Sequence, residues 1–296
     1  MSSGSLASSG SIQESILLFL RPGTLHEALQ SLSQTRATIL SGGTDLFPAI
    51  TGGQLRGPVL DISALSELKG IQVTPGHICI GARTTWSELF AASLPCGFGG
   101  LRAAAREIGS MQIQNQATVA GNICNASPAA DGVVALLALD AEITLTSQGA
   151  TRSLPLADFV QGNRKTARRP DELLTSIRIP RHWENAASSF LKLGARRYLV
   201  ISIVMVAANL LVGPGGRIRE AAICVGSCSP RAIRLAELER DLVGITVSPE
   251  AFHLLRAEHF SPLSPIDDIR ATASYRREAA QTLVRRALLE CASKIG

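Results

Sequence analysis

Two glycine-bearing segments, SGGTDLF at residues 41–47 and TVAGNICNASPAAD at residues 118–131, carry residue types that suit a pyrophosphate. Glycine has no Cβ, so backbone N–H groups near it can approach phosphate oxygens closely. A helix that begins just after such a turn adds unpaired N–H groups and the positive end of its dipole. One such turn is common, but two with these flanks together favour pyrophosphate binding over a purely structural role.

Neither segment matches a common nucleotide-binding motif. The sequence contains no GxxxxGK[ST] P-loop and no GxGxxG fingerprint with an acidic residue about 20 positions further on. ATP chemistry and an ordinary NAD-binding fold are therefore disfavoured.

The first glycine turn lies between a predicted strand and a predicted helix. The apolar run Ala37 to Leu40 predicts a buried strand that leads into the turn. Thr44 or Asp45 has the character of an N-cap for the helix that follows, and Pro48 is tolerated in a first helical turn. Asp45 is favoured as a cap rather than a ligand, because a carboxylate would repel a pyrophosphate.

The second glycine turn, Ala117 to Asn125, is expected to lead into a helix that begins near Ser127 and Pro128. Asp131 falls in the first turn of that helix. There it could serve the helix dipole alone, or it could accept hydrogen bonds from sugar or ribityl hydroxyls.

Several segments carry a resemblance that covers the chain almost from end to end. The chain resembles the FAD-binding (medium) subunit of the molybdenum hydroxylases, the family of xanthine dehydrogenase and carbon monoxide dehydrogenase. The most specific matches are IGSMQIQNQATVAGNICNASPAAD at 108–131 and PIDDIRATASYRREAAQTLVRRAL at 265–288. The similar segments also include ILSGGTDLFPAI at 39–50, ICIGARTTWSEL at 78–89 and ELLTSIRIP at 172–180.

The resemblance implies FAD as the cofactor and assigns residues to it. Residues 39–46 would wrap the FAD diphosphate from one side and residues 118–122 from the other. Asp131 would bind the sugar-alcohol portion, and three further side chains would lie near the flavin ring system. The implied cofactor-binding residues are Ile39, Leu40, Ser41, Gly42, Gly43, Thr44, Asp45, Leu46, Ile108, Thr118, Val119, Ala120, Gly121, Asn122, Asp131, Leu174 and Lys192.

Two positions depart from the family pattern. Ala120 stands where the family usually has a second glycine, so the backbone there must adopt a conformation that alanine accepts. Val200 replaces a frequent aspartate, which changes the hydrogen bonding expected near the reactive edge of the flavin. Tyr198 could lie over or beside the ring, or it could simply pack.

The resemblance implies an α+β protein with two parts. A two-subdomain FAD-binding fold of the vanillyl-alcohol oxidase type (PCMH-type) would be followed by a C-terminal antiparallel sheet plus helices of the CO dehydrogenase flavoprotein type. FAD would lie between the two subdomains, with one glycine turn from each. The expected parts are a mobile N-terminus at 1–11, FAD-binding subdomain 1 at 12–62, FAD-binding subdomain 2 at 63–181 and a C-terminal α+β domain at 188–296.

Within the C-terminal part, apolar runs over 188–230 joined by the GPGGR turn at 213–217 predict antiparallel strands. The longest apolar run, Leu199 to Val212, predicts a buried strand and is too short to span a membrane. Helices are expected after the strands, over 231–242, 248–258 and Tyr275 to Lys294.

The charge of the chain is informative mainly by its position. The 296 residues carry a formal net charge of +5, and all of it arises in residues 181–296. With only 4% aromatic residues, nucleic-acid binding is not expected. The basic run at 164–169 ends in Pro170 and predicts a loop. A solvated helix face is favoured over a docking face for acidic proteins at Arg276, Arg277, Arg285 and Arg286.

The cysteines and histidines predict no metal site. The six cysteines form no CxxC pair and no zinc spacing, and none of the five histidines forms a metal-like pair. Cys124 is expected to be a small packing residue, while Cys224 and Cys228 suit a strand that runs into a turn. Free thiols and the lack of a visible secretory signal fit a reducing cytoplasm.

These observations predict an oxidoreductase subunit in which the flavin, rather than a catalytic side chain, is the redox group. The resemblance implies a hetero-oligomer with a [2Fe-2S] small subunit and a molybdopterin-binding large subunit, and NAD⁺, a quinone or O₂ as acceptor. One alternative is a stand-alone FAD-dependent reductase or oxidase of the same superfamily. A second is a cofactor-free assembly scaffold that keeps the fold.

Overall fold

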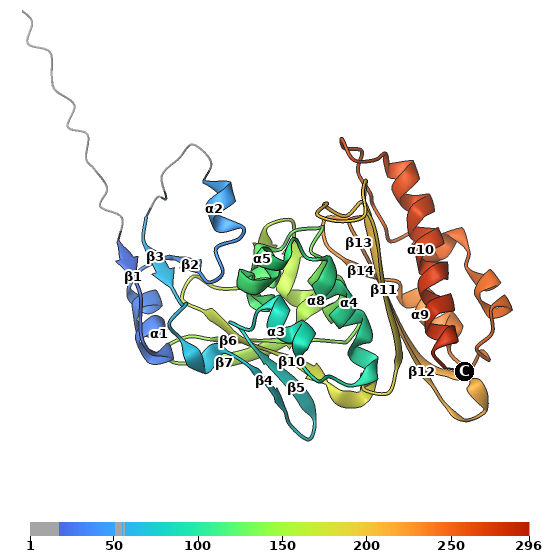
Figure 1. Cartoon of the computed structure of the whole chain (residues 1–296), viewed down its shortest axis with the longest axis horizontal. Coiled ribbons are helices and arrows are strands. Elements are labelled where there is room, and N and C mark those ends of the chain that lie inside the picture. Colours follow the sequence, from blue (N-terminus) through green and yellow to red (C-terminus); the bar gives the residue numbers. More distant parts are fainter. Residues whose placement is uncertain (1–17, 51–54, 56, 296) are drawn as a thin grey trace, which may run out of the picture.

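A small parallel sheet begins the part of the chain that the computed structural model describes, which is residues 18–50, 55 and 57–295 (Figure 1). The mobile segment expected at 1–11 lies outside these residues. Strands β1 (Phe19–Leu20), β3 (Val59–Asp61) and β2 (Thr38–Leu40) lie side by side in that order, with helix α1 (Leu25–Gln34) between β1 and β2 in sequence. A capping box of Thr24 and Glu27 begins α1, whose apolar face packs in a cluster with Leu60.

A five-stranded antiparallel sheet follows. Its order is β4 (Ile71–Val73), β5 (His77–Gly81), β10 (Leu173–Pro180), β6 (Glu142–Thr146) and β7 (Thr151–Pro155). Burial alternates along β6, as its apolar and polar side chains alternate, so one face of the sheet is turned to the core. The strand predicted over 141–147 is thus confirmed.

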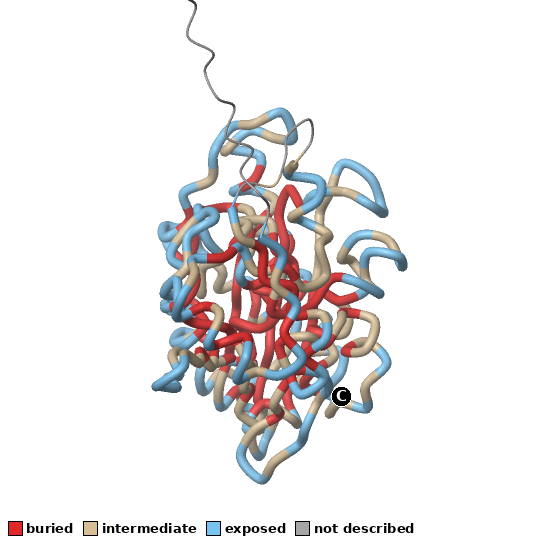
Figure 2. The backbone as a smooth tube through the Cα atoms, turned by 90° about the vertical axis from the view of Figure 1, so that its left-hand side faces the viewer, coloured by how far each residue is buried: buried red, intermediate tan, exposed pale blue. Residues whose placement is uncertain are grey.

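Helices cover the inner face of this sheet and separate it from the C-terminal sheet. Helix α4 (Gly99–Glu107) contacts β11, and helix α7 (Asp131–Leu137) contacts β12 and β13. All seven residues of α7 are buried, as expected for a helix enclosed on every side. Figure 1 shows this green helical layer between the two sheets, and Figure 2 shows the buried residues running through the middle of the molecule. The remaining helices here are α3 (Trp86–Ala91), α5 (Met111–Gln116), α6 (Val119–Asn125) and α8 (Leu156–Phe159).

The C-terminal sheet has the antiparallel order β11 (Ala187–Leu193), β12 (Val204–Val212), β13 (Ile218–Gly226) and β14 (Ile233–Arg234). The strands and turn predicted over 188–230 are confirmed, and Cys224 and Cys228 lie where β13 runs into a turn. The strand predicted from Leu199 begins only at Val204, because Leu199 has a left-handed backbone (φ 53°) that interrupts extended structure.

Helices pack on the outer face of this sheet. The long helix predicted from Tyr275 is confirmed as α10 (Ala273–Ser293), whose N-cap Thr272 accepts a hydrogen bond from the Tyr275 N–H. Of the helix predicted over 231–242, only α9 (Ala236–Leu242) forms, because Ile233 and Arg234 pair with β13 instead. The segment predicted as helical over 248–258 contains 3₁₀ turns at Glu250–Leu254 and Ala257–Phe260.

Arg276 corrects the prediction of a solvated helix face on α10. Its side chain is buried, and it donates to the carbonyl oxygens of Ile203 (2.6 Å) and Ser227 (3.1 Å) and pairs with Asp268 (2.7 Å). The arginine therefore ties α10 to the two strand ends beneath it. Arg277, Arg285 and Arg286 are exposed, as predicted.

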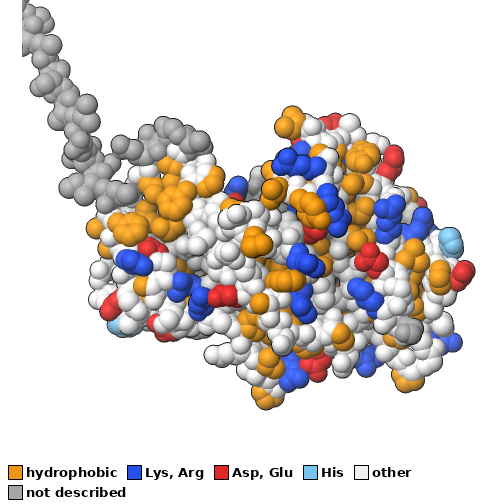
Figure 3. Space-filling model, viewed as in Figure 1, with side chains coloured by type: hydrophobic (Ala, Val, Ile, Leu, Met, Phe, Trp, Pro, Cys, Tyr) orange, Lys and Arg blue, Asp and Glu red, His pale blue; other side chains and the backbone are white. Residues whose placement is uncertain are grey.

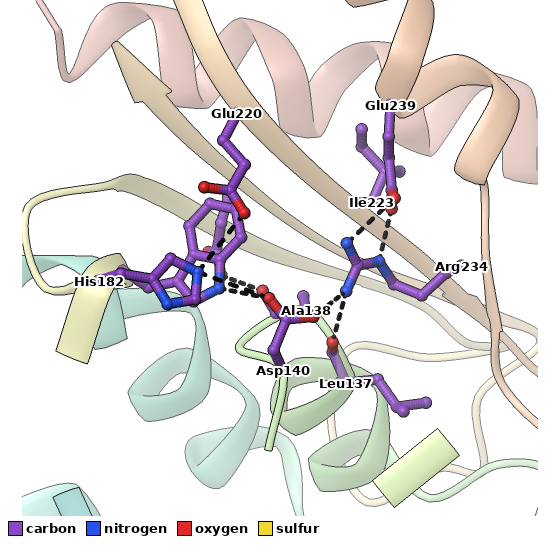
Figure 4. A network of polar contacts seen from close by, with 10 residues as sticks. Leu137, Ala138, Asp140, His182, Glu220, Ile223, Arg234 and Glu239 are labelled. Carbon is purple, nitrogen blue, oxygen red and sulfur yellow. Dashed lines mark hydrogen bonds and ion pairs between the residues drawn. The ribbon is translucent and has the colours of Figure 1, made fainter. Parts of the chain in front are cut away.

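A polar junction joins the helical layer to the C-terminal sheet (Figure 4). Asp140 has a left-handed backbone (φ 51°) and accepts hydrogen bonds from the Trp183 indole N–H and from Arg234, both at 2.7 Å. Arg234 also pairs with Glu239 at 2.5 Å and donates to the Leu137 carbonyl at 2.9 Å. Each charge at this junction therefore has a partner of opposite sign.

His182 joins this junction and lies beside two carboxylates. Its Nε2 lies 3.7 Å from Asp140 Oδ2 and 3.5 Å from Glu220 Oε1. The three ligand atoms lie within 4.8 Å of one another. The three residues are far apart in sequence, so no spacing rule could reveal them.

Candidate functional site

A cleft of about 1220 Å³ opens between the N-terminal unit and the helical layer. Both glycine-bearing segments line it, and residues from the start of the C-terminal sheet close one end. Figure 3 shows the surface hollowed between the lobe that carries α2 (Leu46–Ala49) and the middle of the molecule. Small-molecule sites usually have roughly 300–1,000 Å³, so this cleft suits a large, elongated ligand.

The first glycine turn packs directly on the backbone just before the second. A Cβ on Gly42 would lie 2.0 Å from the Gln116 carbonyl oxygen, so only glycine permits this approach. Gly43 has φ 71°, the left-handed region that favours glycine. Asp45 is the N-cap residue of α2 by position, but its side chain makes no capping hydrogen bond. The capping role predicted for Asp45 is therefore not realised.

The second glycine segment forms a helix earlier than predicted. Thr118 is the N-cap of α6, and its hydroxyl accepts a hydrogen bond from the Gly121 N–H at 3.0 Å. The backbone next to Thr118 is held beside the residues that precede α3, because the Val119 N–H donates to the Thr84 carbonyl at 2.9 Å. Most of the turn expected over 117–125 is thus a short helix, α6 (Val119–Asn125). Ala120 lies within that helix and accepts its conformation without strain.

Two residues that line the cleft each carry a buried polar atom that has no partner within the described chain. These atoms are Ser41 Oγ, from the first turn, and Asn122 Oδ1, from the second. A buried polar atom without a hydrogen bond costs free energy, on the order of 1–3 kcal/mol.

A buried ion pair lies deeper in the cleft. Lys192 Nζ is 2.7 Å from Asp131 Oδ2, and the Ser202 hydroxyl donates to Asp131 Oδ1 at 2.6 Å. Lys192 also donates to the Glu107 carbonyl at 3.2 Å. Burial raises the pKa of the Asp131 carboxyl, while Lys192 and Ser202 oppose that rise. Asp131 lies in the first turn of α7, as predicted.

The structure brings the predicted site residues together with one exception. All of those named from the sequence line the cleft except Val119, whose side chain is fully buried in the hydrophobic core. Cys124 was expected to pack, but it is exposed and lines the cleft. Val200 also lines the cleft. Tyr198 is 67% exposed and lies outside the lining, so it neither packs nor faces the cleft.

Several lining residues escaped the sequence reasoning. Arg164 and Arg168 belong to the basic run that was read as a plain loop, and Arg36 precedes the first predicted strand. Ser110 and Ile113, from the start of α5, also line the cleft. The positive charge of these arginines is the one signal that the sequence offers for them. It does not identify them as site residues, because they lie away from the two glycine segments along the chain.

Two known protein families match consecutive parts of the chain. Residues 11–182 match the FAD binding domain in molybdopterin dehydrogenase. Residues 189–291 match the CO dehydrogenase flavoprotein C-terminal domain.

Individual relatives match nearly the whole length. The nicotinate dehydrogenase FAD-subunit of Eubacterium barkeri is 31% identical over 282 residues, which cover 92% of this chain and 95% of that protein. The glyceraldehyde dehydrogenase medium chain of Sulfolobus acidocaldarius is 30% identical, with 93% and 98% covered. A solved carbon monoxide dehydrogenase from Hydrogenophaga pseudoflava, which lacks the Mo-pyranopterin moiety of its molybdenum cofactor, superimposes with a TM-score of 0.87 at 25% identity. That comparison covers 94% of this chain and 97% of the other.

Within residues 18–50, 55 and 57–295, none of the helices is long and apolar enough to cross a membrane.

Proposed function

The chain belongs to the family of the FAD-binding domain in molybdopterin dehydrogenase, and from this premise we propose that it is the electron-transfer subunit of a molybdenum hydroxylase. In this role it takes electrons from a [2Fe-2S] centre on a partner chain. It passes them to NAD⁺, a quinone or O₂. FAD is its cofactor, and the chain is an oxidoreductase subunit.

The cleft fits FAD by an observation independent of family membership. The two glycine turns meet in its wall, where a Cβ on Gly42 would lie 2.0 Å from the Gln116 carbonyl oxygen. Because glycine has no Cβ, backbone N–H groups near it can approach the phosphate oxygens of FAD closely. This close meeting of two glycine turns in a cleft of about 1220 Å³ is the observation that carries the proposal.

The proposed roles of the residues follow the length of the cleft. Residues 39–46 and 118–122 hold the diphosphate. Asp131 faces the sugar-alcohol portion, while Ile108 and Leu174 offer apolar surface to the ring system. Val119 supports α6 from the core rather than touching the cofactor.

When bound, FAD supplies the one- and two-electron chemistry that no amino-acid side chain offers. The residues of the chain bind and orient it. Lys192 and Asp131 form a buried ion pair with 2.7 Å between Nζ and Oδ2, so the two opposite charges lie together in the cleft wall.

The partners follow from the same proposal. The medium chains among its relatives belong to enzymes with further chains, and the chain is proposed to assemble with a [2Fe-2S] small subunit and a molybdopterin-binding large subunit. Assembly would take place in the cytoplasm. The division at 12–62, 63–181 and 188–296 is proposed to correspond to two FAD-binding subdomains and a C-terminal domain.

A first experiment tests cofactor binding. The full-length chain, purified alone, is expected to bind FAD non-covalently, because no histidine or cysteine follows a known flavinylation pattern. Acid or heat should then release the flavin into the supernatant. Flavin that stays with the precipitated polypeptide would contradict non-covalent binding, and a colourless chain that takes up no FAD would favour the scaffold alternative.

A second experiment tests the conduit role. Candidate substrates, such as an aldehyde, a purine, an N-heterocycle and carbon monoxide, are added to the isolated chain while the flavin absorbance is followed. The flavin should stay oxidised until the iron–sulfur and molybdenum subunits are added. Bleaching of the isolated chain by a substrate would instead establish a stand-alone flavoenzyme.

A further inference from the structure

The charged side chains that line the cleft leave an excess of positive charge. The cations are Arg36, Arg164, Arg168 and Lys192, and the carboxylates are Asp45 and Asp131. Lys192 and Asp131 neutralise each other as a buried pair. The remaining charged side chains are three arginines and one carboxylate, so the lining has a net charge of +2.

None of this excess comes from the two glycine turns. Residues 39–46 and 118–122 contain Asp45 as their one charged side chain, so the turns themselves contribute a negative charge. Backbone N–H groups and hydroxyls can hydrogen-bond a diphosphate, but they do not cancel its two negative charges. The positive side chains of the lining lie elsewhere in the fold.

A hairpin far along the sequence brings Arg164 to the cleft. Strands β8 (Val160–Gly162) and β9 (Lys165–Thr166) pair, and Arg164 turns between them with a left-handed backbone (φ 56°). Its N–H donates to the Ala126 carbonyl at 2.9 Å, which fixes the hairpin on the C-terminal end of α6. Its guanidinium has no hydrogen-bond or ion-pair partner within the described chain.

Arg168 is held more rigidly than Arg164. Its Nη1 donates to the carbonyl oxygens of Glu172 (2.8 Å) and Arg169 (3.1 Å). Glu172 in turn pairs with Arg152 at 2.6 Å and accepts from the Arg169 N–H at 2.7 Å. These contacts occupy one edge of the Arg168 guanidinium and leave its Nε and Nη2 without a partner in the described chain. The charge is thus fixed at the cleft wall before any ligand arrives.

We propose that Arg164 and Arg168 neutralise the diphosphate of FAD and thereby make the cleft select the dinucleotide over uncharged flavin. This inference rests on the proposed function, because it takes FAD as the ligand. A guanidinium matches phosphate oxygens in geometry and stays charged at any physiological pH. Both arginines are positioning residues for the cofactor and leave the redox chemistry to the flavin.

The test compares FAD with riboflavin, which carries the same ring system but no phosphate. Arg164→Gln and Arg168→Gln each remove a charge from the full-length chain, and the double variant removes both. Arg169→Gln is the matched control, because Arg169 is the exposed neighbour of Arg168 and does not line the cleft. Each flavin-free protein is titrated with FAD and with riboflavin, and the fluorescence of the flavin reports binding.

Each single variant should bind FAD about tenfold more weakly, which corresponds to about 1.4 kcal/mol. The double variant should lose about 100-fold, while riboflavin binding and the Arg169→Gln control remain unchanged. Higher salt should weaken FAD binding to the parent chain more than to the double variant, since fewer charges remain to be screened. Arg164→Lys should retain most of the affinity because it keeps the charge.

Three results would overturn the inference. They are unchanged FAD affinity in the double variant, equal losses for FAD and riboflavin, or an equal loss in Arg169→Gln. Unchanged thermal unfolding of each variant establishes that the fold is intact. A parent chain that binds FAD no more tightly than riboflavin would overturn the selectivity alone, whereas one that binds neither flavin would overturn the proposed function as well.

Discussion

Replacement of Gly42 by alanine should separate the two glycine turns. The new Cβ would lie 2.0 Å from the Gln116 carbonyl oxygen and 2.8 Å from its carbonyl carbon. An ordinary contact requires at least 3.4 Å, so one backbone must move by about 1.4 Å. Both neighbouring atoms belong to the main chain, and a change of side-chain rotamer cannot relieve the clash.

A movement of this size should weaken FAD binding strongly. Overpacking of this kind costs typically about 1–3 kcal/mol, and the ligand is proposed to contact both turns at once. If the separation costs FAD that much binding free energy, its affinity should fall by a factor of roughly 5 to 150. The C-terminal sheet should remain folded, because the hydrophobic cluster that it forms with α9 and α10 contains no residue of either turn.

The assay titrates the full-length variant with FAD and follows thermal unfolding in parallel. Gly149→Ala is the matched control, since nothing lies within 4 Å of a Cβ built at that turn glycine. The control should bind FAD like the parent chain. If Gly42→Ala binds FAD as tightly as Gly149→Ala, the two turns do not hold the cofactor together in the way the structure indicates.

Three further outcomes are expected. Gly121→Val should weaken FAD retention at least about tenfold, because a Cβ there would lie 2.8 Å from the capping Thr118 hydroxyl; wild-type retention would remove Gly121 from the diphosphate site. Lys192→Met should lower the free energy of unfolding by about 3 kcal/mol in denaturant titrations, because Asp131 stays buried without its partner; an unchanged value would show that water replaces the lysine. The hydrogen bond from Arg152 lowers the pKa of the Glu172 carboxyl, so this group stabilises the fold above its ordinary pKa and the stabilisation is lost as the pH falls through its lowered value. Unfolding midpoints should therefore fall less steeply with acid in Glu172→Gln than in the parent chain, and identical slopes would contradict this assignment.

Local patterns in the sequence predicted the elements that depend on neighbouring residues. The alternation in β6, the apolar runs of β12 and β13 and the amphipathic spacing of α10 all appear where they were expected. Of the residues that the two glycine segments and the family resemblance assigned to the cofactor, all but Val119 line the cleft. The errors among these predictions lie at boundaries: the second turn starts a helix at Val119, and β12 begins five residues later than the apolar run did.

Tertiary packing alone decided which side chains became buried, paired or exposed to the cleft. Arg276 was predicted to be solvated, yet it reaches the ends of two strands that lie far away in sequence. Cys124 was predicted to pack, but α6 turns it toward the cleft. Arg164 and Arg168 reach the same cleft through a hairpin pinned on the end of α6.

The physical reason is the range of the forces involved. Backbone sterics, capping hydrogen bonds and side-chain periodicity act within a few residues, so the order of residue types determines them. Burial and electrostatic pairing depend on distance in space, and a carboxylate such as Asp140 meets His182 and Arg234 only after separate segments have packed. The sequence alone therefore determined the helices, the strands and the kind of ligand, whereas the charge that surrounds that ligand was decided by the packing of the whole chain.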